Sequence, residues 1–147
     1  MKVLRKLLAG LAGSVVLTVI HESMRRLQKT APRMDLLGEE ALSKGLHKAG
    51  MKVPGEQKLF NWTLAGDIIG NALYYNLINV GSRKKPMAKG TLLGLAAGIG
   101  GVVLPKYLGL NPAHSGRTPR TKAMTITWYL IGGLTAAAVL KLIDRNE

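Results

Sequence analysis

The stretch TLLGLAAGIGGVVL, residues 91–104, contains no charged side chain and repeats glycine at Gly94 and Gly98, four residues apart, in step with Gly90 before it. It belongs to an apolar block that extends to Leu110, close to the ~20 residues with which an α-helix crosses a bilayer. In a helix, these three glycines share one face and form a groove that a second backbone can approach closely. The stretch therefore predicts a transmembrane helix over residues 90–110 that packs tightly against another helix, of the same chain or of a second copy.

Three further apolar blocks of similar length occur elsewhere, at residues 3–24, 59–80 and 123–143. The last contains Gly132 and Gly133, each followed four residues later by an alanine, which gives a second face for close, glycine-zipper packing. A soluble protein with buried core helices is the alternative, but the length and spacing of the blocks favour the bilayer. We expect an all-α integral membrane protein with four transmembrane helices in one compact bundle, forming a single domain over residues 1–147.

Nearly all the charge lies in the connections between these blocks. The 147 residues include 21 Lys and Arg against 8 Asp and Glu, a net charge of +13, although 47% of the residues are hydrophobic. Basic residues that border apolar blocks are attracted to anionic lipid headgroups. No aromatic platform is interleaved with them, so we expect a lipid bilayer as the partner and no nucleic acid. Since the chain has no cysteine, disulfides and thiolate chemistry are excluded.

The connector after the first block contains a helix signal of its own. Asp35 marks its start, Gly50 its stop, and the leucines between them share one face. We expect a short amphipathic interfacial helix over residues 35–49.

The first block resembles a signal peptide in its basic start and apolar centre, but no small-x-small cleavage site follows it. We interpret it as a retained anchor. Lys and Arg are divided almost evenly between the two sides of the predicted bundle, so the orientation stays open. The prediction is a multi-pass integral membrane protein of the bacterial inner membrane type.

A polar stripe interrupts the second block, with side chains four residues apart along one helix face. Its members are Thr63, Asp67, Asn71, Tyr75 and Asn79. A carboxylate at bilayer depth costs about 2.5 to 3.5 kcal/mol and therefore has a partner or a function. Two interpretations stay open: Asp67 is a proton- or cation-linked site on a pathway along the stripe, or it is paired with a basic residue such as Arg25 or Lys106.

A second polar cluster lies where the first block ends, at His21, Glu22 and Arg25. The simplest expectation is a Glu22–Arg25 salt bridge or stacking of His21 on Arg25. If this end meets the stripe in space, His21, Glu22 and Asp67 form an acid/base or metal constellation. Because no His-x-x-x-His spacing is present, we predict no metal and no cofactor.

Aromatic residues stand near the ends of three blocks, where amphipathic rings favour the membrane interface. They are Trp62, Tyr107, Trp128 and Tyr129.

Three functional hypotheses follow. The leading one is a channel or transporter for a small solute or ion, acting as a homo-oligomer past Asp67. The second is an accessory or scaffolding subunit of a larger membrane complex. The third is a membrane enzyme acting on lipid headgroups, in which His21 and Glu22 act while Arg25, Arg117 or Arg120 holds a phosphate; a non-enzymatic role is favoured over it.

Overall fold

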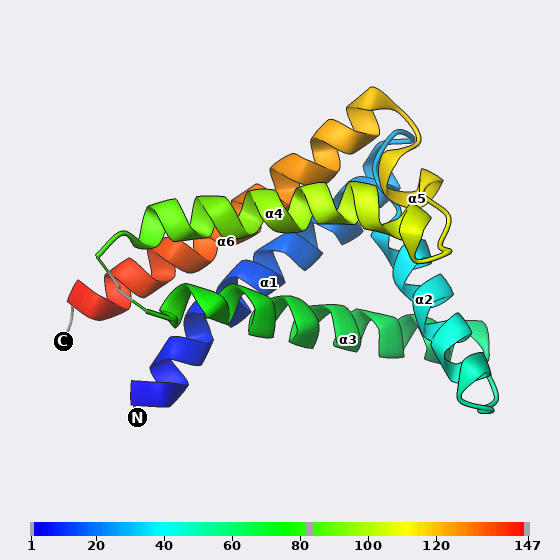
Figure 1. Cartoon of the computed structure of the whole chain (residues 1–147), viewed down its shortest axis with the longest axis horizontal. Helices are drawn as coiled ribbons and strands as arrows, with labels where there is room; N and C mark the ends of the chain where they lie inside the picture. Colours follow the sequence, from blue (N-terminus) through cyan, green and yellow to red (C-terminus); the bar gives the residue numbers. More distant parts are fainter. Residues whose placement is uncertain (1, 82–83, 146–147) are drawn as a thin grey trace.

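The computed structural model of the protein describes residues 2–81 and 84–145, with side chains from Leu7 onward, as helices joined by turns (Figure 1). The helices are α1 (Lys2–Leu27), α2 (Met34–Lys48), α3 (Glu56–Tyr75), the 3-10 helix η1 (Asn76–Asn79), α4 (Pro86–Tyr107), α5 (Ala113–Gly116) and α6 (Pro119–Arg145). The four long helices run in alternating directions between two ends of one bundle (Figure 1). The predicted all-helical fold is confirmed.

Helix α6 organises the bundle. It packs against α1 on one side and against α4 on the other, while α1 also packs against α3. Leu17, Tyr75 and Trp128 form the centre of one apolar core, and Ile78 and Leu140 belong to a second. In contrast, α3 and α4 barely touch, so the bundle is open between them.

The glycines of α4 lie directly on α6. A Cβ atom built on Gly94 would lie 2.7 Å from the Cα of Leu130, and one on Gly98 would lie 2.6 Å from the Cα of Ile126. A Cβ atom on Gly90 would collide with the carbonyl oxygen of Gly133, which itself lies against the Gly90 backbone. The close approach that these glycines allow is therefore made within one chain.

Three of the described helices are long and apolar enough to cross a membrane: α1 from Leu7 to Leu27, α4 and α6. Helix α3 has a comparable length of 20 residues, but Lys58, Asp67 and amide side chains such as Asn61 and Asn71 lower its mean hydropathy, and it is not among these three. The expectation of four spans is therefore supported for three helices.

The observed helices all begin before the predicted positions, α4 at Pro86 and α6 at Pro119, and the largest difference is at the end of the second block. Its α-helix starts earlier than predicted and ends at Tyr75, where the chain tightens into η1. The connector helix α2 ends as expected: Gly50 adopts a φ of +71°, which closes the last turn through a hydrogen bond from Met51 N to Leu46 O.

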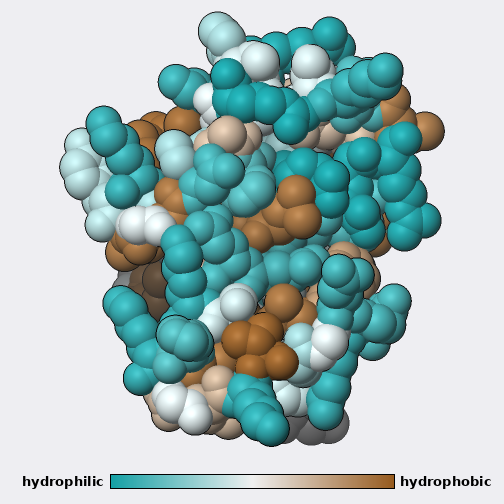
Figure 2. Space-filling view, turned by 90° about the vertical axis from the view of Figure 1, so that its right-hand side faces the viewer, coloured by the Kyte–Doolittle hydropathy of each residue, from teal (hydrophilic) through white to brown (hydrophobic). Residues whose placement is uncertain are grey.

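Helices α2 and α5 gather at the end of the bundle where α1 finishes and α6 begins (Figure 1). Seen from that side, the surface is mainly hydrophilic, with apolar patches recessed between charged side chains (Figure 2). The outward faces of the long helices are different, because residues such as Val19, Ile99 and Leu104 are exposed on them. One polar end and apolar flanks are the surface pattern of a membrane protein.

Candidate functional site

A cavity of about 480 Å³ occupies the space where α3 and α4 separate, with α2 across it. Its walls are mainly apolar and include small residues of α4, Ala97 and Gly101 among them, and Leu37 of α2. The polar residues that line it are Asp67, Asn71, Tyr74 and Tyr129. The structure thus forms an open, mainly apolar hollow with a few polar groups from α3 and α6, the usual composition of a small-molecule site.

Asp67 has no ionic partner in the described part of the chain. Arg25 binds Glu22 instead, with Nη2 2.7 Å from Oε2, and reaches Asp35 at 3.6 Å. Lys106 lines a different pocket. The structural interpretation, in which Asp67 is paired with Arg25 or Lys106, is therefore not what the described residues show.

Helix α2 approaches this region closely because residue 38 is glycine. A Cβ atom on Gly38 would lie 2.5 Å from Cγ2 of Thr63 and 3.5 Å from Oδ2 of Asp67. Thr63 is buried beneath α2, and its hydroxyl has no hydrogen-bond partner among the described residues. A side chain at position 38 would therefore push α2 away from the carboxylate.

The structure divides the predicted polar stripe. Asp67 and Asn71 line the cavity, but Tyr75 is fully buried and donates a hydrogen bond of 2.8 Å to the carbonyl oxygen of Tyr129. Asn79 lies in η1, where its amide donates to the backbone oxygen of Asn76 at 3.3 Å. The stripe is thus not one continuous pathway.

The reason is the pitch of the helix. Each four-residue step advances about 40° around the axis, because one turn contains about 3.6 residues. Tyr74, seven residues after Asp67, lies about 20° from the direction of Asp67, whereas Tyr75 lies about 80° from it. Tyr74 accordingly lines the cavity and donates a 2.8 Å hydrogen bond to Leu93 O of α4. A pattern that alternates four- and three-residue spacings, from Asp67 to Asn71 to Tyr74, includes this residue, whereas the predicted stripe with a constant four-residue spacing does not.

His21 lies behind one wall of the cavity. Its ring centroid is 5.0 Å from that of Trp128 and 5.7 Å from that of Tyr129, and both contacts are edge-on. The side chain is buried, and neither ring nitrogen has a hydrogen-bond partner among the described residues. Trp128 therefore packs inside the bundle on His21, whereas Trp62 and Tyr107 are exposed.

The predicted Glu22–Arg25 salt bridge is confirmed, while stacking of His21 on Arg25 is not seen. Arg25 lies over the ring of Phe60 instead, 5.4 Å from its centroid. In residues 2–81 and 84–145, no group of three His, Asp or Glu side chains is placed to hold a metal ion. The constellation of His21, Glu22 and Asp67 is thus not assembled as a metal site.

Asp35 anchors the start of α2, a role that the sequence reasoning did not identify. Arg33 reaches its carboxylate at 2.6 Å and Arg25 reaches it at 3.6 Å. Burial alone would raise the pKa of Asp35, but the hydrogen bonds from Arg33 and the charges of both arginines outweigh it and hold the pKa below 3.8. The sequence signal for this ion pair is the spacing of Arg33 and Asp35, a basic and an acidic residue two positions apart at the start of a helix.

Further along, α2 is tied to the loop after α4. Glu40 accepts hydrogen bonds from Lys44 at 2.7 Å and from the backbone nitrogen of Asn111 at 3.0 Å, and both lower its pKa. Lys44 also donates to the carbonyl oxygen of Gly109 at 2.5 Å. Helix α2 is therefore held across the cavity by polar contacts near its start and in its second half.

Comparison with known proteins found no relative of this chain. No protein-family model matches the chain, and neither the curated proteins nor the solved structures give a match.

Proposed function

We propose that this chain is a small multi-pass membrane protein that binds a small cationic or hydrogen-bond-donating solute at Asp67 and carries it across the bilayer. The observation that carries the proposal is a carboxylate that lines a largely apolar cavity and lacks an ionic partner in the described part of the chain. A carboxylate in such surroundings is stabilised by a proton or by a cation. A solute that supplies either one gains affinity there.

The distribution of side chains on α3 supports a place for this helix at bilayer depth. Ile69 and Leu73 are exposed on its outer side, at 60% and 61%, while Asp67 and Asn71 line the cavity. Polar residues inside and apolar residues outside are the arrangement expected of a membrane helix beside a polar site. On this proposal, α3 is the fourth crossing despite its lower mean hydropathy.

A carrier fits the cavity better than an open pore. Beyond Asn71, the path along α3 is closed by Tyr74, whose hydroxyl donates a hydrogen bond to Leu93 O across the gap to α4. Above the cavity, α2 is held by the contacts of Asp35 and Glu40. Passage of a solute therefore requires a conformational change that opens one side at a time.

The two other hypotheses receive less support. The arginines that a lipid-headgroup enzyme would use lie at the same end as His21, but Arg25 binds Glu22 and Arg117 binds the carbonyl oxygens of Lys29 and Ala31. An accessory subunit is distinguished by purification from native membranes, where stoichiometric foreign subunits favour it and a chain that purifies alone or with copies of itself opposes it. A homo-oligomer is part of our proposal only as an expectation, because the glycine faces of α4 and α6 are occupied within the chain.

The decisive experiment is flux into liposomes. Purified protein is reconstituted with a pH-sensitive dye inside, and a panel of alkali cations and small organic amines is added outside. We expect amine- or cation-driven movement of protons above that of protein-free liposomes in the wild type, and only the protein-free background in Asp67→Asn. Glu56→Gln, in the first turn of the same helix and outside the cavity lining, is the matched control and should retain flux.

Circular dichroism and gel filtration verify that Asp67→Asn is folded. Wild-type liposomes without flux for the whole panel, or a folded Asp67→Asn variant with wild-type flux, would overturn the proposal.

A further inference from the structure

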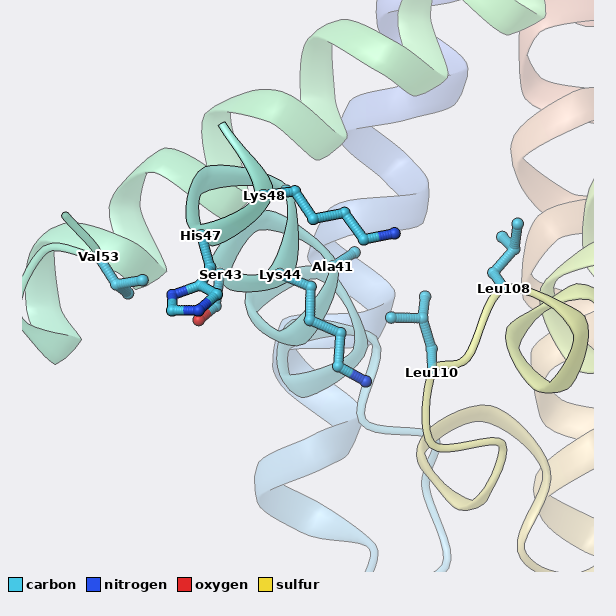
Figure 3. A pocket seen from close by; sticks show the side chains of 9 residues that line it. Ala41, Ser43, Lys44, His47, Lys48, Val53, Leu108 and Leu110 are labelled. Carbon is cyan, nitrogen blue, oxygen red and sulfur yellow. The ribbon is translucent and has the colours of Figure 1, made fainter. Parts of the chain in front are cut away.

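A second pocket, of about 510 Å³, lies beside α2 on the polar end of the bundle (Figure 3). It is lined by Ala41, Ser43, Lys44, Gly45, His47, Lys48, Val53, Leu108 and Leu110. Three of these residues, Ala41, Leu108 and Leu110, also line the cavity that contains Asp67. The two hollows are therefore neighbours that share an apolar wall.

The pocket combines basic groups with apolar ones. Lys44 and Lys48 are one helical turn apart, and Figure 3 shows both side chains extending from α2 toward the loop that carries Leu108 and Leu110. None of the lining residues is acidic. Glu40 binds Lys44 from outside the pocket, whereas Lys48 has no ion pair within the described residues. The pocket thus presents net positive charge above an apolar floor.

The pocket lies between the apolar end of α4 and the lysines of α2, and this position indicates the kind of ligand. Its apolar floor continues toward α4, where Leu104 and Leu108 line the neighbouring cavity and are 54% and 67% exposed. Along the outside of the bundle, apolar surface therefore comes first, then Leu108 and Leu110, and then the lysines. A phospholipid has the same order, from acyl chain to phosphate, and lysines near the surface attract anionic lipids.

We infer that this pocket binds an anionic phospholipid, with the phosphate at Lys44 and Lys48 and the start of an acyl chain on Leu108 and Leu110. The two lysines donate hydrogen bonds to the phosphate oxygens, and Lys44 is already positioned for this by Glu40 and the carbonyl oxygen of Gly109. A lipid in this place would also hold α2 against the end of α4. The inference does not depend on transport through the Asp67 cavity.

The test measures lipid binding to the full chain in detergent. Dioleoyl phosphatidylglycerol, dioleoyl phosphatidylcholine and inorganic phosphate are titrated separately, and binding is followed by native mass spectrometry and by the thermal unfolding midpoint. We expect the phosphatidylglycerol to bind and to raise the midpoint, phosphatidylcholine to bind more weakly, and phosphate alone to have little effect.

Two variants test the residues. Because each lysine near an anionic lipid contributes about a fivefold change in affinity, Lys48→Gln should weaken phosphatidylglycerol binding about fivefold and Lys44→Gln/Lys48→Gln about 30-fold. The control Lys29→Gln/Lys122→Gln removes the same charge from exposed positions outside the pocket lining, in the turn after α1 and the first turn of α6, and should leave the affinity within about twofold of the wild type.

Lys48→Gln keeps the inference testable if the double variant fails to fold, since Lys48 makes no ion pair in the described part of the chain. Equal loss of affinity in the control pair would show a diffuse charge effect and overturn the inference. Unchanged binding in Lys48→Gln would overturn it as well. Binding of inorganic phosphate as tight as that of the lipid would assign the pocket to free phosphate instead.

Discussion

The contact between α4 and α6 gives the sharpest stability prediction, for Gly94→Ala. The added Cβ atom would lie 2.7 Å from the Cα of Leu130 and 2.8 Å from the carbonyl oxygen of Tyr129. Both are backbone atoms, so no side-chain rotation relieves the clash and the two helices must move apart. Overpacking of this kind costs about 1–3 kcal/mol, while alanine gains about 0.5–1 kcal/mol over glycine in a helix. We expect a net loss of about 0–2.5 kcal/mol in the free energy of unfolding, centred near 1 kcal/mol.

Gly100→Ala is the matched control on the same helix. Its Cβ atom would meet only Cδ1 of Leu104, a flexible side chain, at 3.4 Å. This variant should be neutral or more stable by up to about 1 kcal/mol. The free energy of unfolding is measured by titrating SDS into protein in mild detergent micelles and following helicity. If Gly94→Ala is as stable as Gly100→Ala, α4 and α6 do not pack through this face and the reasoning fails.

Two further predictions concern contacts that position the cavity. Tyr75→Phe removes the buried hydrogen bond to the carbonyl oxygen of Tyr129 and should lower the free energy of unfolding by about 0.5–1.5 kcal/mol in the same SDS titration; a wild-type value would show that the phenol hydroxyl has no structural role. Asp35→Asn removes the carboxylate whose pKa lies below 3.8. A lowered pKa means that this carboxylate stabilises the fold fully above its ordinary pKa and progressively less as the pH falls toward the folded value. The wild type should therefore melt at a higher temperature than Asp35→Asn at neutral pH and lose this advantage below about pH 3.8. An equal difference at both pH values would contradict the role of the ion pair with Arg33.

Local patterns predicted the elements well because they depend on neighbouring residues only. The stop of α2 at Gly50 follows from the freedom of glycine to adopt positive φ. The Glu22–Arg25 pair follows from a three-residue spacing within one helix. The sequence could not show whether Arg25 pairs with Asp67. In the structure Arg25 contacts Glu22 and Asp35 instead, and only the docking of α2 brings Asp35 near it.

Which aromatic residues lie in the interior also could not be predicted from the pattern of any single helix. Trp128 stands near the start of an apolar block, where either the interface or the core is possible. The packing of α1 on α6 decides for the core, since it places His21 against the indole ring. In the same way, the division of the polar stripe depends on which neighbour each part of α3 meets.

The sequence by itself determined that the chain is helical, that most of its charge lies at the ends of apolar blocks, and that glycines on α4 and α6 allow close packing. These properties are set by composition and by periodicity along single helices. Only the tertiary structure decided that α3 and α4 separate, that α2 covers the gap, and that Asp67, Asn71 and Tyr74 share it while Tyr75 is sealed in the core. The physical reason is that a cavity depends on where helices fail to touch, and this follows from the packing of all of them together.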